Sequence, residues 1–199
     1  MAGAFPISTA KFESLGIKSI QNTIISKSVS GKKLARQIDG QRWGFTARII
    51  TAKRSDVYGE LMAFIIKQRS GKENFTIVPP EVEDARGTAS GTPTGTASAG
   101  ATSITLGGTG TGTLKAGDFI KFANHSKVYM VVADQSDIST GSLTIEPPLT
   151  TAVSSSNIQF DNIPFTVYLT NDIQEFGVVG ADKDGNALYQ FEFDVEESL

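Results

Sequence analysis

The chain contains no cysteine and a single histidine, His125, among its 199 residues. Disulfides, thiolate metal sites and cysteine nucleophiles are therefore excluded. No second His or Cys is present to complete a zinc site or a catalytic triad with His125. His125 lies between Asn124 and Ser126 in a turn-forming stretch, where an isolated histidine is expected to be a solvated loop residue. These absences argue against an enzyme, and the redox compartment stays undetermined.

Long apolar runs are also missing. None reaches the roughly 20 residues that a membrane-spanning helix needs, so we expect no membrane association. The first residues lack a charged segment followed by an apolar core, and we expect no secretory signal. A hydrophobic content of 39% and a mean hydropathy of -0.08 are typical of a soluble globular protein. This length allows one good core or two small ones.

Charge is absent from residues 88–113, a tract of mainly Gly, Thr, Ser and Ala. By composition we expect residues 88–100 to be a flexible linker. Residues 101–106 alternate in polarity and are expected to be the first strand of the module that follows. Residues 114–149 combine short strand patterns with turn signals, which is typical of a small antiparallel barrel or sandwich. We therefore predict a linker plus an inserted β-module over residues 88–157.

The flanking segments have a different character and are expected to form one host domain, residues 1–87 and 158–199. Residues 1–30 indicate an extended arm or first strands. Residues 32–40 are polar and end in an Asp-Gly turn signal. Further strands are expected where apolar and polar residues alternate. These are residues 41–51, with Trp43, Phe45, Ala47 and Ile49 on one face, and residues 74–78, 164–170, 175–179 and 187–195.

One helix is predicted, over about residues 55–69. Ser55 suits the N-cap, and Val57, Leu61, Phe64 and Ile65 follow helical spacing. Gly71 is a plausible terminator. Gly59 inside the helix costs about 1 kcal/mol relative to Ala, so packing is tight there or the helix is marginal. The predicted fold is mainly β: a tube-like antiparallel β-sandwich with one α-helix, interrupted by the inserted barrel-like domain.

The net charge of -3 is unevenly distributed. Residues 1–54 hold ten Lys or Arg and two Asp or Glu, a net +8, whereas residues 158–199 hold one basic and nine acidic residues, a net -8. The two ends can pair as adjacent strands of one subunit or across neighbouring subunits of a ring. Both alternatives stay open. The basic segment alone is weak evidence for nucleic-acid binding.

Four patterns offer chemistry, and each has a simpler structural interpretation. Asp182, Asp184 and Asn186 alternate like a calcium loop, but a hairpin turn is expected because a strand follows. Residues 107–112 are Gly-rich, but an ordinary loop is expected because no Lys-Ser/Thr and helix follow as in a phosphate loop. The other two patterns are the aromatic pair Trp43 and Phe45, expected in the core rather than as a stacking platform, and the carboxylates Glu192, Asp194, Glu196 and Glu197, expected on the solvated face and tail of the last strand. No catalytic, cofactor-binding or metal-binding residue is assigned.

Three stretches together resemble the distal tail proteins of long-tailed bacteriophages. They are the strand around Trp43 with the helix ending at residues 63–71, the Phe-containing strand at 74–79, and residues 114–149 with their Ala-Gly-Asp, Val-Tyr and Pro-Pro-Leu signatures. The charge-free tract at 88–113 is longer and more repetitive than the family pattern.

The resemblance implies a non-enzymatic virion protein, made in the host cytoplasm, that forms a homohexameric ring at the distal end of the tail tube. The implied partners are the tail tube protein, the baseplate hub, and fibre or receptor-binding proteins, with DNA passing through the lumen without sequence-specific contact. A closed ring needs head-to-tail contacts, which oppositely charged ends suit. The competing hypotheses are another tail component, such as a tube subunit or baseplate hub or adaptor, a carbohydrate-binding adhesin module, and a cell-wall or polysaccharide hydrolase.

Overall fold

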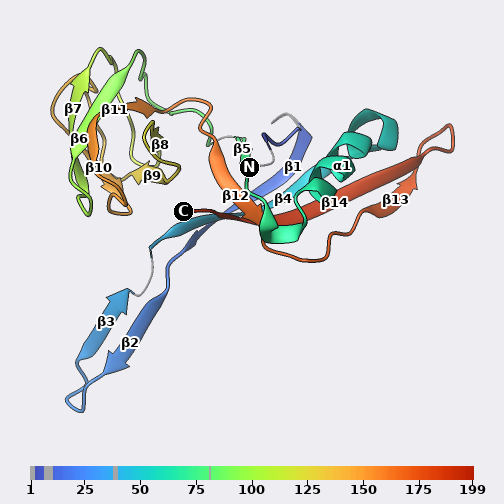
Figure 1. The fold of residues 1–199 in the computed structure, drawn as a ribbon, viewed down its shortest axis with the longest axis horizontal. Coiled ribbons are helices and arrows are strands. Elements are labelled where there is room, and N and C mark those ends of the chain that lie inside the picture. Colours follow the sequence, from blue (N-terminus) through green and yellow to red (C-terminus); the bar gives the residue numbers. More distant parts are fainter. Residues whose placement is uncertain (1–2, 7–10, 38–39, 81) are drawn as a thin grey trace.

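The structure is a computed structural model and describes residues 3–6, 11–37, 40–80 and 82–199. The described residues are mainly β, with one α-helix and a closed barrel, as predicted. Figure 1 shows a host sheet with its helix, the barrel beside one end of it, and a projecting hairpin. Within the described residues, no helix is long and apolar enough to cross a membrane.

The host domain is built on one antiparallel sheet in the order β1-β4-β14-β12-β5, with β13 pairing to β14. Its strands come from both ends of the chain, which places the charged termini in one sheet. The bounds are β1 (Phe12–Ile20), β4 (Arg42–Lys53), β5 (Phe75–Ile77), β12 (Phe165–Leu169), β13 (Gly177–Ala181) and β14 (Ala187–Glu197).

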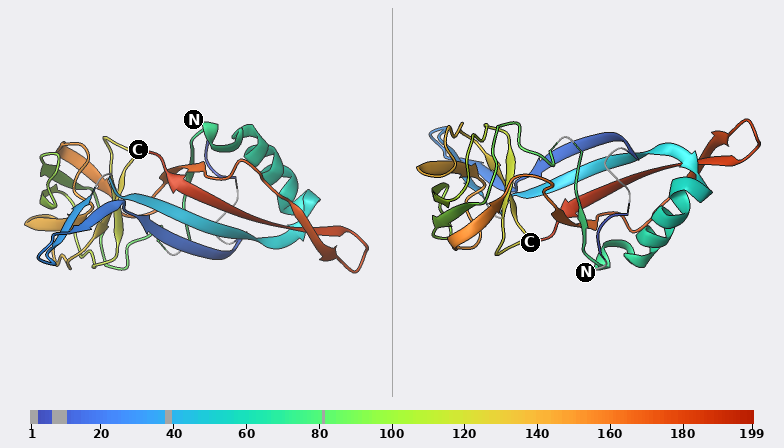
Figure 2. Two further views of the ribbon diagram at one scale, coloured as in Figure 1. Left: turned by 90° about the horizontal axis from the view of Figure 1, so that it is seen from below. Right: turned by 90° about the horizontal axis from the view of Figure 1, so that it is seen from above.

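The core of the host lies between one sheet face and the helix α1 (Gly59–Lys67). Because side chains alternate across a strand, Phe45, Ala47 and Ile49 of β4 point to this face together with Phe191 and Phe193 of β14. In both views of Figure 2, α1 runs along that side of β4 and β14. The alternation predicted for both strands is therefore confirmed.

The helix begins differently from the prediction. A π-helical turn, η2 (Arg54–Tyr58), precedes α1, and Lys53 is the N-cap without a side-chain hydrogen bond. Ser55 Oγ instead donates to Asp56 Oδ1 at 3.0 Å. Gly59 stands where the π-turn passes into α1, and a Cβ there would lie 2.9 Å from the Arg54 carbonyl oxygen. Tight packing therefore explains the glycine.

The helix also ends differently. Arg69 takes the left-handed conformation, at φ 54°, just before a 3₁₀ turn, η3 (Ser70–Lys72), and the first residue of that turn, Ser70, is also left-handed at φ 59°. Gly71 therefore does not supply the left-handed residue of the terminus. A Cβ on Gly71 would lie 2.6 Å from the Leu169 carbonyl oxygen, so close contact with β12 is what requires glycine there.

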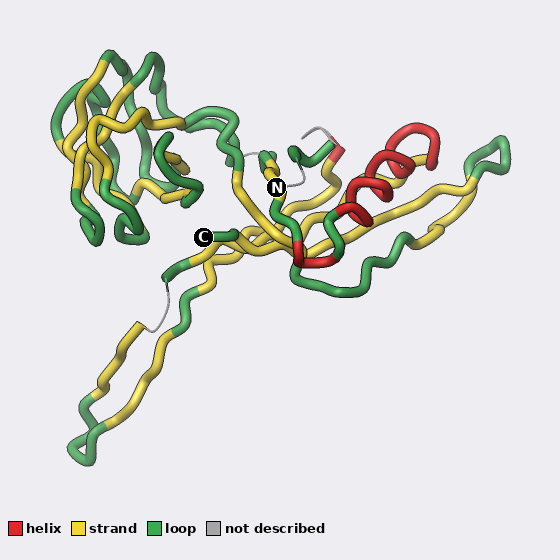
Figure 3. Tube along the Cα trace, viewed as in Figure 1, coloured by secondary structure: helices red, strands yellow, loops and turns green. Residues whose placement is uncertain are grey.

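The inserted module is a closed barrel in the order β10-β7-β6-β11-β8-β9. Its core is separate from the host core and includes Ile104, Ile120, Phe122, Tyr129 and Val131. Figure 3 shows the short strands and connecting turns of this unit. The bounds are β6 (Pro93–Ala97), β7 (Ser103–Gly108), β8 (Phe119–Phe122), β9 (Val128–Val131), β10 (Ser142–Glu146) and β11 (Val153–Gln159).

Residues 88–100 are not a linker, which corrects the prediction. They contain β6, the first barrel strand, so residues 101–106 contribute to the second strand, β7. Hydroxyls pair across the ribbon, with Thr92 Oγ1 and Thr109 Oγ1 2.7 Å apart and Ser90 Oγ and Thr111 Oγ1 2.9 Å apart. The Gly- and Thr-rich composition led to the wrong prediction of a flexible linker. In the structure the glycines allow close approach of the backbones, and the Thr hydroxyls pair across the ribbon.

The strands β2 (Thr23–Lys27) and β3 (Lys33–Gln37) form a separate two-stranded hairpin. We call this hairpin, residues 23–37, the arm. The prediction of an extended arm or first strands within residues 1–30 agrees with β1, which ends at Ile20, and with β2. No strand was predicted at β3, because neither face of it is buried and its apolar pattern is weak. The Asp-Gly turn predicted at 39–40 includes a residue outside the described ones.

Charges of opposite sign from the two ends of the chain meet within this sheet. Arg42 Nη1 lies 3.0 Å from Glu196 Oε1, and Lys18 Nζ lies 3.1 Å from Asp194 Oδ1. Lys53 also pairs with Asp182. The alternative of adjacent strands in one subunit is therefore confirmed for these residues. The basic residues of the arm take no part in these pairs.

Candidate docking surfaces

The barrel is joined to the host sheet by a buried ion pair. Lys127, just before β9, places Nζ 2.5 Å from Glu197 Oε2 at the end of β14. The second Glu197 oxygen accepts from the Val128 backbone N–H at 2.9 Å, and Oε2 also accepts from the Trp43 N–H at 3.1 Å. Trp43 Nε1 in turn donates to the Val128 carbonyl at 2.9 Å. Barrel and host therefore share one hydrogen-bonded network.

Apolar contacts surround this network. Phe119 and Val128 belong to the barrel strands, yet both side chains pack into the host core. The Trp43 and Phe119 rings meet edge to face at 5.0 Å, and Phe119 meets Phe165 at 5.7 Å. The strands β8 and β9 thus bury one face in the barrel and the other against the host. The junction between the modules therefore combines buried polar and apolar contacts.

The electrostatics of the junction depend on complete pairing. The side chains of Lys127 and Glu197 are 2% and 0% exposed. Burial lowers the pKa of Lys127, and the charge of Glu197 acts in the opposite direction. Lys127 Nζ also donates to Gln41 Oε1 at 2.8 Å, which satisfies a further proton of the ammonium. A buried pair of this kind is strongly destabilised when one partner is removed.

The prediction that Glu197 lies on the solvated tail of β14 is wrong. Glu197 has the same parity as Phe191, Phe193 and Val195, so the alternation of the strand turns it inward. The alternation of the strand was therefore the signal in the sequence that could have predicted burial of Glu197. Burial of a carboxylate is favourable only with a partner such as a cation, and here that cation comes from a distant segment. The other three carboxylates follow expectation more closely, since Glu192 is exposed and Asp194 and Glu196 are partly exposed on the polar face.

The Ala-Gly-Asp signature closes the barrel where the chain enters it. Asp118 is buried, and its Oδ1 accepts from the Arg86 backbone N–H at 3.0 Å while Oδ2 accepts from the Lys115 N–H at 2.7 Å. The Arg86 side chain also pairs with Asp118. Gly117 takes φ 97°, a left-handed value that favours glycine in this turn. The motif therefore fixes the entry segment to the turn before β8.

The Val-Tyr signature and His125 form a second polar cluster at the barrel. The Tyr129 hydroxyl lies 2.8 Å from His125 Nε2 and 3.0 Å from Thr150 Oγ1. His125 Nδ1 lies 2.8 Å from Asn124 Oδ1, and its ring stacks on Phe122 at 5.8 Å. Burial lowers the pKa of His125. The histidine is thus half-buried and packed in place, which corrects the expectation of a solvated loop residue.

The alternating Asp182, Asp184 and Asn186 form a hairpin turn, as predicted. Asp182 Oδ1 accepts from the backbone N–H groups of Asp184, at 2.8 Å, and of Asn186, at 2.9 Å. Lys53 pairs with the same carboxylate, and these bonds hold the pKa of Asp182 well below its usual range. The described residues contain no group of three or more His, Cys, Asp or Glu side chains that could hold a metal ion.

The two remaining candidate patterns are structural. Trp43 and Phe45 are buried, so neither offers a stacking platform, as expected. Gly107 and Gly108 lie at the end of β7, while Thr111 bridges to Ser90. Residues 107–112, expected as a loop, are thus partly strand.

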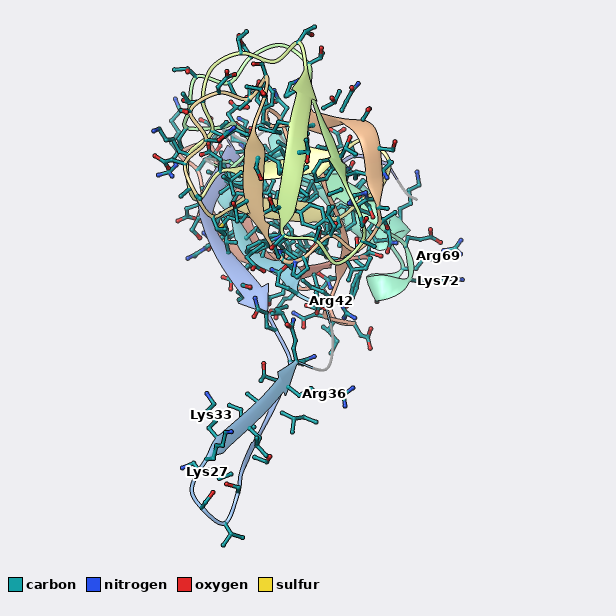
Figure 4. All side chains as sticks on the ribbon, turned by 90° about the vertical axis from the view of Figure 1, so that its left-hand side faces the viewer. Lys27, Lys33, Arg36, Arg42, Arg69 and Lys72 are labelled. Carbon is teal, nitrogen blue, oxygen red and sulfur yellow. The ribbon has the colours of Figure 1, made fainter. Side chains whose placement is uncertain are left out.

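The arm is the most exposed surface of the host. All residues of β2 and β3 are exposed, and Figure 4 shows the hairpin projecting from the body of the molecule with Lys27, Lys33 and Arg36 along it. Its turn is held by Ser28, whose Oγ accepts from the Lys32 N–H at 3.1 Å. Residues 23–37 contain four Lys or Arg and no Asp or Glu.

Residues 82–163 match the family model described as "Distal tail protein pb9, B domain". The match contains every barrel strand, together with the Arg86–Asp118 pair at the entry. A comparison with curated proteins finds no match.

Proposed function

We propose that this chain is a distal tail protein of a phage and a structural subunit of a ring at the distal end of the tail tube, because residues 82–163 match the B-domain model of such a protein. A component of the phage tail must bind other tail components. In this proposal the host domain forms the ring, and the barrel docks baseplate or receptor-binding components.

The observation that carries this proposal is the joint between the B domain and the host sheet. The buried pair of Lys127 and Glu197 and the packing of Phe119 and Val128 hold the barrel in one orientation. A joint with this many buried contacts can transmit position and force between a ring and whatever binds the barrel, which suits an assembly part. The side chains first considered for catalysis or metal binding, such as His125 and Asp182, are engaged in local structural contacts.

In the proposed assembly, subunits made in the host cytoplasm close into a homohexamer. One face of the ring contacts the tail tube protein, and the other contacts the baseplate hub and fibre or receptor-binding proteins. DNA passes through the lumen without sequence-specific contact. A head-to-tail interface that closes on itself generates such a ring.

Electron microscopy of the purified full chain at high concentration tests the proposal. We expect closed rings of one or two layers. Long tubes would indicate a tube subunit instead, and particles that stay monomeric at every concentration would contradict ring formation. Monomers that bind a glycan array would indicate a carbohydrate-binding module.

A further inference from the structure

Exposed large apolar side chains gather at two places on the described surface. The first is the arm, with Ile24, Ile25 and Leu34 on its strands and Val29 in its turn. The second is the segment of residues 171–181, which includes β13 and which we call the β13 edge. There Ile173 is 85% exposed, Val178 60% and Val179 53%. Clustered apolar exposure of this kind marks interaction sites.

The arm has no core of its own. Ser26 pairs with Leu34 and Ile24 with Arg36, so Ile24 and Leu34 share one face of the hairpin. Ile25 lies on the other face with Lys27 and Lys33. Both faces are exposed. An isolated two-stranded hairpin is marginal in water, so the arm needs a partner for stability.

The β13 edge offers an open sheet edge. Within the part of the chain that the structure describes, β13 pairs with β14 alone. Its outer backbone groups are therefore free to pair with an added strand. Strand addition supplies backbone hydrogen bonds, and neighbouring side chains supply selectivity.

The charges of the two surfaces are complementary. The arm carries Lys27, Lys32, Lys33 and Arg36, and none of the four forms an ion pair among the described residues. The β13 edge carries Asp172 and Glu175 and no Lys or Arg. Both carboxylates are exposed. Opposite potentials favour this pairing over arm-to-arm or edge-to-edge contact.

The two surfaces lie at opposite ends of the molecule. In Figure 1 the arm extends to the lower left, whereas β13 lies at the far right along the longest axis. An arm therefore cannot reach the β13 edge of its own chain. A contact between them joins two copies head to tail, which is the geometry that a closed ring requires.

We propose that the arm of each subunit docks on the β13 edge of the next copy, adding its strands to the host sheet of that neighbour. This inference rests on the proposed ring and names the surfaces that form it. The occupant of the β13 edge is a second copy of this chain.

Cysteine cross-linking tests the contact without background, because the natural chain has no cysteine. The full chain carrying both Leu34→Cys and Val178→Cys should form a series of disulfide-linked multimers on oxidation, and each single variant should not. Leu34→Cys combined with Ile66→Cys is the matched control, since Ile66 is similarly exposed but belongs to α1 rather than to the β13 edge. Multimers in the control, or dimers of Leu34→Cys alone, would overturn the inference.

Charge reversal gives a second, independent measurement. Lys27→Glu with Lys33→Glu should raise the protein concentration needed for ring formation at least tenfold. Adding Asp172→Lys with Glu175→Lys should restore the original concentration. Lys67→Glu with Lys72→Glu changes two other exposed cations and should leave rings intact. Circular dichroism shows whether each variant is folded.

The outcomes separate this inference from the proposed function. Rings that form in the natural chain but survive the arm reversal, without the cross-link, would overturn the arm contact and leave the ring standing. Absence of rings in the natural chain would contradict the ring itself. Retention of the natural chain by double-stranded DNA, lost on arm reversal while rings persist, would show that the arm binds nucleic acid instead.

Discussion

At the scale of single residues, Glu197 shows how one carboxylate connects two modules. It accepts from Lys127 and Val128 of the barrel side and from Trp43 of the host, all without solvent access. An ion buried this way is favourable only while every partner is in place. We therefore expect Glu197 to specify the geometry of the junction more than to add stability.

Replacing Glu197 by Gln should destabilise the protein by about 3–5 kcal/mol, because Lys127 would remain buried without its counter-charge. Denaturant unfolding followed by circular dichroism measures the loss. Glu196→Gln is the control, since the Glu196 pair with Arg42 is partly exposed and worth about 1 kcal/mol or less. Equal losses in the two variants would refute a special role for the buried pair.

At the scale of elements, the barrel shows why a repetitive tract can be ordered. Strand β6 runs through the tract and passes close to the barrel interior at Gly95. A Cβ there would lie 2.7 Å from the Phe122 ring and 2.8 Å from the Ile104 side chain. Close packing thus requires glycine at this position. On the exposed side, the hydroxyl pairs Ser90–Thr111 and Thr92–Thr109 join the two segments next to β6 and β7.

Gly95→Ala should therefore cost about 1–3 kcal/mol through overpacking of the barrel core. Gly107→Ala is matched to it in the neighbouring strand, where the nearest atom, Thr94 Oγ1, lies 3.5 Å from the added Cβ. That control should change stability by no more than about 0.5 kcal/mol. Thermal or urea unfolding of both variants provides the comparison, and a tolerated Gly95→Ala would mean that the tract is as loose as its composition indicates.

At the scale of the whole molecule, the barrel and the host should behave as one cooperative unit. The host core includes Phe119 and Val128 from the barrel strands, so neither module can separate without exposing apolar surface. Trp43 is the single tryptophan of the chain and lies at this contact.

Trp43 fluorescence and far-ultraviolet circular dichroism should therefore report the same thermal midpoint, because separation at the junction and loss of strands occur together. Both signals can be recorded on one sample of the full chain. A fluorescence transition that precedes the loss of strand signal would show that the modules part before they unfold.

Local patterns in the sequence determined much of this protein. Alternation in residues 41–51 and 187–195 predicts the two longest host strands and their buried faces, because a half-buried strand must alternate. The Asp182 turn and the position of the helix follow from equally local chemistry. Three short stretches together, the last of them residues 114–149, indicated the phage distal tail proteins, and the family match over residues 82–163 agrees with this.

Only the tertiary structure decided the rest, because these features depend on contacts between distant segments. Burial of Glu197 needs a lysine brought from the barrel, and the order in residues 88–100 needs the facing strands β7 and β11. Strand β3 lacks a strong apolar pattern, which fits its full exposure among the residues that the structure describes. A single sequence records local preference directly, whereas partners far along the chain become visible only when the fold places them in contact.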